Sequence, residues 1–381
     1  VIAALCLLFL YCKKIWGWSG QEYWMESRDI ESTPRRWIYA AAMVLVFLIT
    51  DLSFYHGMMY PVTYWDSLIY YVHYGKMTYQ QGGFPILYCL QVGLGLGANY
   101  PHLFPLHQAV TAILFNHWSD LYAQMIAPLA GLGSMILLYY LVVYLFEDRV
   151  TAILAVLAFR TVTFVNSYFI WTSDYALVML YTCLFLLFLA LFLDWESMAG
   201  LQPLLLTAAI FPHINYLGWI VWPCVALAVM LWWFRGMEYN GDRPHVLWVG
   251  LVVFAWCGLA LIWYIRNYIV TGNPVYAFFP EIFGGKNINL DVLRSCEQEW
   301  LAHGNGVAGL GATLWERLQN TPFFLLTDWR PAPLTAGLFL PALLLWSKRF
   351  SKFFAVSALL LFLYLVYEYV ISGLYLYHII A

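Results

Sequence analysis

A carboxylate stands out in the polar, aromatic stretch from Tyr60 to Pro85, because almost everything around this stretch is apolar. This carboxylate is Asp66, which follows Trp65 and lies four residues before Tyr70. A positioned aspartate can act as a general base that removes the proton of a hydroxyl group. Asp66 is equally well placed to cap a short helix that begins at the next residue. Both interpretations stay open, and the first makes Asp66 a candidate catalytic residue.

A second carboxylate, Asp174, lies in the segment Trp171-Thr-Ser-Asp-Tyr175, directly before a long apolar run. Its side chain could orient a reacting hydroxyl. It could also share Mg²⁺ or Mn²⁺ with Asp66, because hard cations prefer oxygen ligands. An aspartate before an apolar run is typical of a helix N-cap as well, and a cap does not exclude a ligand role. We therefore expect Asp66 and Asp174 to be the catalytic pair and the ligands of any divalent cation.

Four basic side chains are candidates for binding a phosphate group: Arg266, His213, His102 and Lys76. A guanidinium group matches phosphate through two parallel hydrogen bonds, so Arg266 is the strongest candidate. Its alternative role is that of an arginine that reaches from a helix end to the membrane interface. The two histidines have structural roles as their alternatives, and Lys76 has a solvated surface position.

The composition places these residues in a membrane. Hydrophobic residues make up 63% and charged residues 10% of the 381 residues, against roughly 25% charged residues in soluble proteins. The apolar runs approach the roughly 20 residues that a helix needs to cross a bilayer and are too long for barrel strands. The net charge of −3 disfavours nucleic acid as a partner. We therefore expect an all-α, polytopic transmembrane helix bundle.

Aromatic residues make up 19% of the chain, which is more than the aromatic belts at the two membrane interfaces require. The surplus suits packing and also contact with a sugar or a lipid. Trp65 and Tyr70 are the candidates for such contacts, because they lie next to Asp66 in the sequence.

The expected membrane spans are the apolar segments Trp37–Tyr55, Ala123–Phe146, Val150–Ile170, Tyr175–Leu193, Leu201–Phe211, Tyr216–Phe234, Val246–Ile265, Ala332–Trp346 and Phe353–Gly373. Short loops rich in Lys and Arg, such as the one between Lys13 and Arg36, mark the cytoplasmic side. This orientation puts Asp66, Asp174, His213 and Arg266 on the extracytoplasmic side. The sequence thus predicts an integral multi-pass protein whose active face is extracytoplasmic.

The long first outer loop contains two shorter apolar pieces, Ser67–His73 and Leu106–Trp118. Both are too short to cross about 30 Å of hydrocarbon, so we expect them to be helices on the outer leaflet. The chain then divides into a partial helix and cytoplasmic loop (1–36), a transmembrane core (37–279), an outer loop (280–331) and C-terminal helices (332–381), and we expect it to continue beyond both ends. Cys89 and Cys296 are the two cysteines on the outer side, where a disulfide could join them.

Several segments together resemble the GT-C superfamily of membrane glycosyltransferases, and most of all the branch related to protein O-mannosyltransferases and lipid A aminoarabinose transferases. The family places its catalytic aspartate just after the first family-type span, where Asp66 stands here. It often carries a lysine and two prolines where this chain has His102 between two prolines. The segments that carry the resemblance are Trp65-Asp-Ser67 with Tyr70 and Tyr71, Gly82-Gly-Phe-Pro85, Tyr100-Pro-His-Leu-Phe-Pro105, Trp171-Thr-Ser-Asp-Tyr-Ala-Leu177, Phe211-Pro-His213 and Arg266-Asn-Tyr-Ile-Val-Thr-Gly-Asn-Pro-Val-Tyr-Ala-Phe-Phe279.

The resemblance implies a helical membrane enzyme that transfers a sugar from a polyprenyl-phosphate donor to the hydroxyl group of a protein, glycan or lipid. Our hypothesis is an inverting hexosyl or pentosyl transfer, with Asp66 as the base and Arg266 at the phosphate, where His102 and His213 are further candidates. Two alternatives stay open. One is a non-catalytic subunit of this fold that packs against partner membrane subunits, and the other is a lipid or solute transporter that uses Asp51, Arg160 and Glu368.

Overall fold

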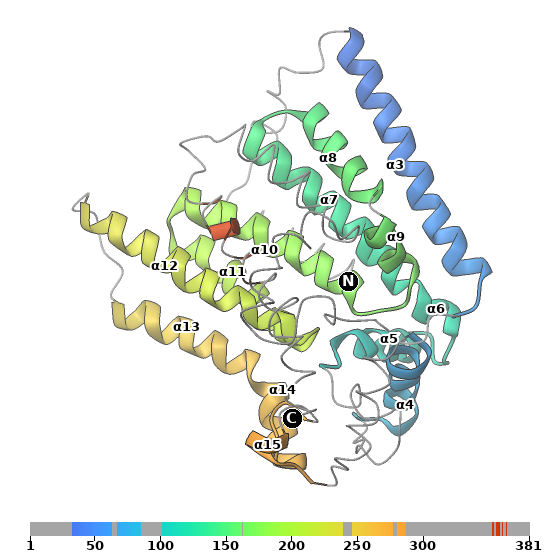
Figure 1. Cartoon of the computed structure of the whole chain (residues 1–381), viewed down its shortest axis with the longest axis vertical. Coiled ribbons are helices and arrows are strands. Elements are labelled where there is room, and N and C mark those ends of the chain that lie inside the picture. The colour runs from blue at the N-terminus through green and yellow to red at the C-terminus, as the bar shows by residue number, and fades with distance from the viewer. Residues whose placement is uncertain are drawn as a thin grey trace, which may run out of the picture. The chain divides into compact units, whose positions relative to one another are not determined.

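A computed structural model describes residues 33–62, 67–84, 101–161, 163–238, 246–276 and 280–286, together with single positions between 353 and 363. All regular secondary structure in these ranges is helical, and they contain no strand (Figure 1). This confirms the predicted all-α class. The expected spans Ala332–Trp346 and Phe353–Gly373, Cys89, Cys296, Glu368 and the loop 287–331 lie outside the described residues, apart from the single positions just mentioned.

Four helical segments are long and apolar enough to cross a membrane. They are α3 (Thr33–Met59), the joined helices α6 (Asp120–Gln124) and α7 (Ile126–Phe146), α10 (Tyr175–Trp195), and the segment Tyr216–Phe234 within η4 (Tyr216–Ile220) and α12 (Val221–Glu238). A fifth candidate consists of α13 (Val246–Ala260) and α14 (Ile262–Thr271), which are bent by 47° where they meet. At 27 residues, α3 is about 40 Å long. These lengths and compositions are consistent with the membrane protein that the composition predicts.

The described parts of the expected span Val150–Ile170 are helical, as α8 (Arg149–Thr161) and α9 (Thr163–Ile170), and position 162 lies outside the described residues. One other expected span differs from the prediction. The segment Leu201–Phe211 corresponds to α11 (Met198–Ile210), whose 13 residues measure only about 20 Å. It ends where Pro212 begins a short 3₁₀ turn.

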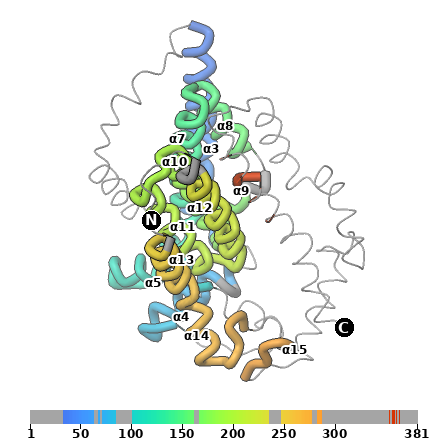
Figure 2. Tube along the Cα trace, turned by 90° about the vertical axis from the view of Figure 1, so that its left-hand side faces the viewer, coloured from blue at the N-terminus to red at the C-terminus, as the bar shows by residue number. Residues whose placement is uncertain are grey.

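The chain forms two compact units. The first contains residues 1–80 and 104–207, with α3 to α10 and most of α11; the second contains residues 81–103 and 208–381. In the first unit α10 packs along α7, α7 packs on α8, and α8 packs on α3. Figures 1 and 2 both show α3, α7 and α8 side by side. Helices that are apolar on all sides must be buried or lie in lipid, and α7 and α10 form the buried centre of this unit.

A buried arginine contacts three helices of the first unit. The side chain of Arg160 on α8 is only 2% exposed and donates hydrogen bonds to Ser53 Oγ (2.5 Å) and to the carbonyl of Ile49 (3.4 Å) on α3. Its guanidinium group lies 4.9 Å from the ring centroid of Phe169 on α9. Three helices therefore meet at this one side chain.

Asp51 does not serve as the counter-ion of Arg160. It is exposed, and it lies two residues from both Ile49 and Ser53 on α3. Residues two positions apart on a helix point to nearly opposite sides. The two charges are therefore directed to different surroundings.

Candidate functional site

The turn between α9 and α10 holds Asp174 in a buried position. Thr172, Ser173 and Asp174 are all almost completely buried, and Asp174 is only 1% exposed. Although Asp174 occupies the N-cap position of α10, its side chain makes no cap hydrogen bond. Its Oδ1 instead accepts a 2.5 Å hydrogen bond from the hydroxyl of Tyr71. The structural alternative for Asp174, a simple helix cap, is therefore not the role that its side chain takes.

Tyr71 reaches Asp174 from a short π-helix, η2 (Ser67–Val72), which continues into α4 (His73–Gln81). π-Helical turns are rare and occur often at functional sites. The ring of Tyr71 packs edge-on against Phe104 of α5 (Leu103–Leu114), with 5.5 Å between ring centroids. The Tyr71–Asp174 bond joins segments that are 103 residues apart in the chain. A short hydrogen bond between a hydroxyl and a carboxylate is among the stronger kinds in proteins.

Glycine allows α4 to approach α5 closely. A Cβ atom at Gly75 would lie 2.5 Å from Gln108 Oε1 and 3.0 Å from the indole of Trp118. This packing holds the end of η2 against α5 and thereby helps to keep Tyr71 in place. Lys76, on the same helix, is exposed, as its solvated alternative requires.

Two of the predicted site residues, Asp66 and Trp65, lie outside the described residues. Tyr70 falls within η2. The next residue after Asp66, Ser67, is completely buried at the start of η2. The two segments that were expected to carry the catalytic aspartates thus meet through Tyr71 in the first unit.

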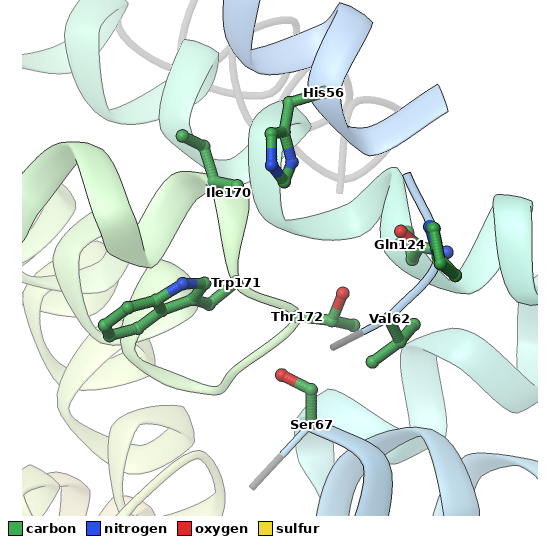
Figure 3. A pocket seen from close by; sticks show the side chains of 8 residues that line it. His56, Val62, Ser67, Gln124, Ile170, Trp171 and Thr172 are labelled. Carbon is green, nitrogen blue, oxygen red and sulfur yellow. The ribbon is translucent and has the colours of Figure 1, made fainter. Parts of the chain in front are cut away.

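A small polar pocket has lining residues from the same two segments, η2 and the α9–α10 turn (Figure 3). Its polar lining comes from four side chains on separate elements: His56 of α3, Ser67 of η2, Gln124 of α6 and Thr172 of the α9–α10 turn. Pro61, Val62, Ile170 and Trp171 complete it. The space is sufficient for about one water-sized group. Sequence analysis named none of these four polar side chains as a candidate site residue. The only available signal was that each stands near the end of an apolar helix.

In the second unit, Trp263 brings two predicted phosphate-binding residues together. The ring centroid of His102 lies 4.7 Å from that of Trp263, and the guanidinium carbon of Arg266 lies 4.7 Å from the same centroid. Arg266 follows Trp263 by one helical turn on α14, so the two side chains lie on the same face. Phe84 packs edge-on against Trp263 at 5.5 Å. Arg266 also donates to Asn267 Oδ1 at 2.9 Å, which orients the guanidinium group.

His213 is held by a different contact. Its Nε2 lies 2.9 Å from the carbonyl of Leu259 at the end of α13, so the neutral ring donates from Nε2. Burial lowers the pKa of His213, and the hydrogen bond to Leu259 acts in the opposite direction. The turn that carries His213 is η3 (Phe211–His213), and Tyr264 donates a 3.0 Å hydrogen bond to the carbonyl of its Pro212. His102 thus contacts Trp263 of α14, and the turn that carries His213 bonds to the next residue of that helix, Tyr264.

The conformation of the His213 turn depends on Gly218 in η4. A Cβ atom at this glycine would lie 2.3 Å from the carbonyl carbon of Phe211 and 2.4 Å from the nitrogen of Pro212. Only a residue without a side chain allows this backbone approach.

The Thr-Gly-Asn-Pro segment at positions 271–274 has a structural role. Gly272 ends α14 in the left-handed region, with φ +81°. Asn273 accepts a hydrogen bond from the amide of Val275 and donates to the carbonyl of Gly284. The hydroxyl of Thr271 bonds to the carbonyls of Asn267 and Asn273. These hydrogen bonds close the turn that follows α14, so this part of the resemblance acts as a local support.

Within the described ranges, no three His, Cys, Asp or Glu side chains gather as metal ligands. The expected pair of Asp66 and Asp174 is not tested by this finding, because Asp66 is outside those ranges. Arg266 and His102 are brought together, Asp174 is joined to η2, and Lys76 stands on the exposed side of α4. Comparisons with protein-family models, curated proteins and solved structures found no match to this chain.

Proposed function

We propose that the protein is an extracytoplasmic, multi-pass glycosyltransferase of GT-C type that moves a sugar from a polyprenyl phosphate to a hydroxyl acceptor. The observation that supports this proposal most is the buried Asp174 carboxylate. Burying a carboxylate is costly unless it is hydrogen-bonded, and Asp174 meets this cost by accepting from Tyr71 and not by capping its own helix. Such a held carboxylate next to a π-helical turn is suited to orienting a substrate group.

In the proposed reaction the oxygen of the acceptor hydroxyl attacks the anomeric carbon from the face opposite to the phosphate. The bond between this carbon and the phosphate oxygen breaks, and its electron pair leaves with the polyprenyl phosphate. The acceptor proton passes to the carboxylate of Asp66, the general base. Asp174 orients the acceptor or, with Asp66, holds Mg²⁺ or Mn²⁺.

The departing phosphate requires positive charge or hydrogen-bond donors. We assign this role to Arg266, with His102 and His213 as further donors. Support comes from the shared contact of Arg266 and His102 with Trp263. Because Nε2 of His213 already donates to the carbonyl of Leu259, His213 can donate to a phosphate only from Nδ1 of the protonated ring. Trp65, Tyr70 and Lys76 remain candidates for contacts to the sugar or phosphate.

The test uses the full chain purified into liposomes, with a panel of polyprenyl-phosphate hexoses and pentoses that carry a radiolabelled sugar. Release of polyprenyl phosphate and labelling of alcohol acceptors are measured separately. Asp66→Asn should slow transfer by roughly 10²-fold or more, the usual range for loss of a general base. Asp51→Asn is the control, because Asp51 is exposed on α3. Full transfer by Asp66→Asn would refute the assignment, and no transfer from any donor would favour the non-catalytic subunit.

The transporter alternative is less well supported. It requires Asp51 and Arg160 to line one path through the bundle. Arg160 instead bonds to Ser53 and lies against Phe169, whereas Asp51 is exposed.

A further inference from the structure

The helix α3 has a broad exposed side that is apolar except for a single charge. Only 11% of the apolar stretch of α3 is buried, against 67% of the corresponding stretch of α10. Its buried residues are Ala42, Ser53 and Gly57, and α7, α8 and α9 all lie on one side of it (Figure 1). The described part of the chain therefore leaves most of the surface of α3 uncovered.

The exposed residues of α3 include a continuous seam along the helix. Val44, Leu48, Asp51, Tyr55 and Met58 follow one another at alternating steps of four and three residues, and all five are exposed. Alternating steps of this kind are the spacing at which one helix packs along another in a left-handed pair. Every position of the seam is apolar or aromatic except Asp51.

Asp51 is a charge at membrane depth. No other Asp, Glu, Lys or Arg stands between Arg36 and the end of α3, and Asp51 makes no hydrogen bond or ion pair with the described residues. With Arg36 at the inner interface, Asp51 lies about 22 Å into a hydrocarbon layer that is about 30 Å thick. Ionisable side chains at such a depth are costly, and they almost always pair with another group.

The charge of Asp51 defines the kind of helix that fits the seam. A carboxylate in hydrocarbon is complemented by a Lys or Arg, but Arg160 is bound to Ser53 on another side of α3. No Lys, Arg or His occurs in the apolar runs that lie largely outside the described residues: 1–12, 332–346 and 353–373. A second copy packed along the same seam would bring one Asp51 against the other, and two like charges repel. The complementary helix therefore belongs to another protein.

We propose that the seam of Val44, Leu48, Asp51, Tyr55 and Met58 binds a transmembrane helix of a partner protein, and that a Lys or Arg of this helix pairs with Asp51. The ion pair sets the register of the two helices, because a shift along the seam leaves both charges unpaired in hydrocarbon. The interface is independent of the transferase function, since an active enzyme and a non-catalytic subunit can both carry it.

The test uses a synthetic membrane-spanning peptide as the probe. The full chain, labelled with an acceptor dye, is reconstituted into phosphatidylcholine liposomes with a donor-labelled peptide of leucine and alanine. The peptide carries one arginine about seven residues from one end, which matches the depth of Asp51. Association is measured by energy transfer, and the same peptide with leucine in place of arginine is the reference. The arginine peptide should associate about three- to tenfold more strongly, as expected for a polar contact between membrane helices.

Variants of Asp51 test the pairing. Asp51→Leu should abolish the preference for arginine, and Asp51→Asn, which keeps an acceptor but no charge, should reduce it. Neither variant should lower the thermal unfolding midpoint, because Asp51 has no partner among the described residues. The matched control is Asp51→Leu/Val44→Asp, which moves the carboxylate along the seam by about 10 Å. This double variant should prefer a peptide whose arginine is shifted by the same distance toward its centre.

Three results would overturn the proposal. Equal association of the arginine and leucine peptides would show that Asp51 does not pair with a helix. Self-association of the chain without peptide, abolished by Asp51→Leu, would make a second copy the occupant. Loss of the arginine preference in liposomes that contain phosphatidylethanolamine would assign Asp51 to the amines of lipid headgroups. Glycosyl transfer enters none of these measurements, so a failure here is distinct from a failure of the proposed function.

Discussion

Replacing Tyr71 by phenylalanine removes one hydroxyl and leaves the ring in place against Phe104. The lost bond is short, at 2.5 Å, and its acceptor is a carboxylate that is only 1% exposed. Hydrogen bonds to charged groups contribute about 1.5–3 kcal/mol. We therefore expect Tyr71→Phe to lower the free energy of unfolding by about 1.5–3 kcal/mol.

The assay is equilibrium unfolding of the purified chain in detergent for Tyr71→Phe, Asp174→Asn and the double variant. If the two side chains interact as the structure shows, the cycle gives a coupling free energy of about 1.5–3 kcal/mol. Tyr39→Phe is the control, because the hydroxyl of Tyr39 meets only the neutral hydroxyl of Tyr139 at 3.3 Å. Its cost should stay near 1 kcal/mol or below. A coupling near zero, or equal costs for the two tyrosines, would refute the reasoning.

Three further predictions concern the supports of the site. Gly218→Ala should lower the free energy of unfolding by about 3 kcal/mol, because the new methyl group would collide with the backbone. Gly250→Ala, which has open space around it, should be neutral or stabilising. The thermal unfolding midpoints of the two variants test this difference. The pKa of His213 is lowered in the fold from its usual 6.5, so the unfolded state binds more protons. The stabilising contribution is therefore full above pH 6.5 and is lost as the pH falls through the folded pKa. Unfolding free energies measured from pH 7.5 to 5 should show this decrease in the wild type and a smaller decrease in His213→Gln. Ser53→Ala should cost about 1.5–3 kcal/mol, because it removes the short bond to the Arg160 guanidinium, and limited proteolysis of α3 should then accelerate.

The local hydropathy pattern was sufficient to predict most of the long helices. An apolar run of about 20 residues predicts a long helix wherever it occurs, and α3, α7 and α10 follow the predicted spans closely. The short length of α11 was missed, because hydropathy does not register where a turn such as η3 begins.

The candidate site was less accessible to sequence analysis. Asp174 was identified from its position before an apolar run, but the pattern could not decide between a cap and a held carboxylate. The partner that decides this, Tyr71, is 103 residues away. The Thr-Gly-Asn-Pro segment belongs to the resemblance, and in the structure Thr271 and Asn273 bond to their own turn. The motif alone did not show that these side chains support a turn.

The sequence by itself determined that this protein is helical and rich in segments suited to a membrane, because hydropathy and helix length are properties of contiguous residues. Only the tertiary structure decided which groups face each other: Tyr71 and Asp174, Arg160 and Ser53, His102 and Trp263. Such pairs depend on how helices pack, and close approaches at glycines such as Gly75 set that packing to within an ångström. A linear pattern of residue types carries no record of distances of this kind.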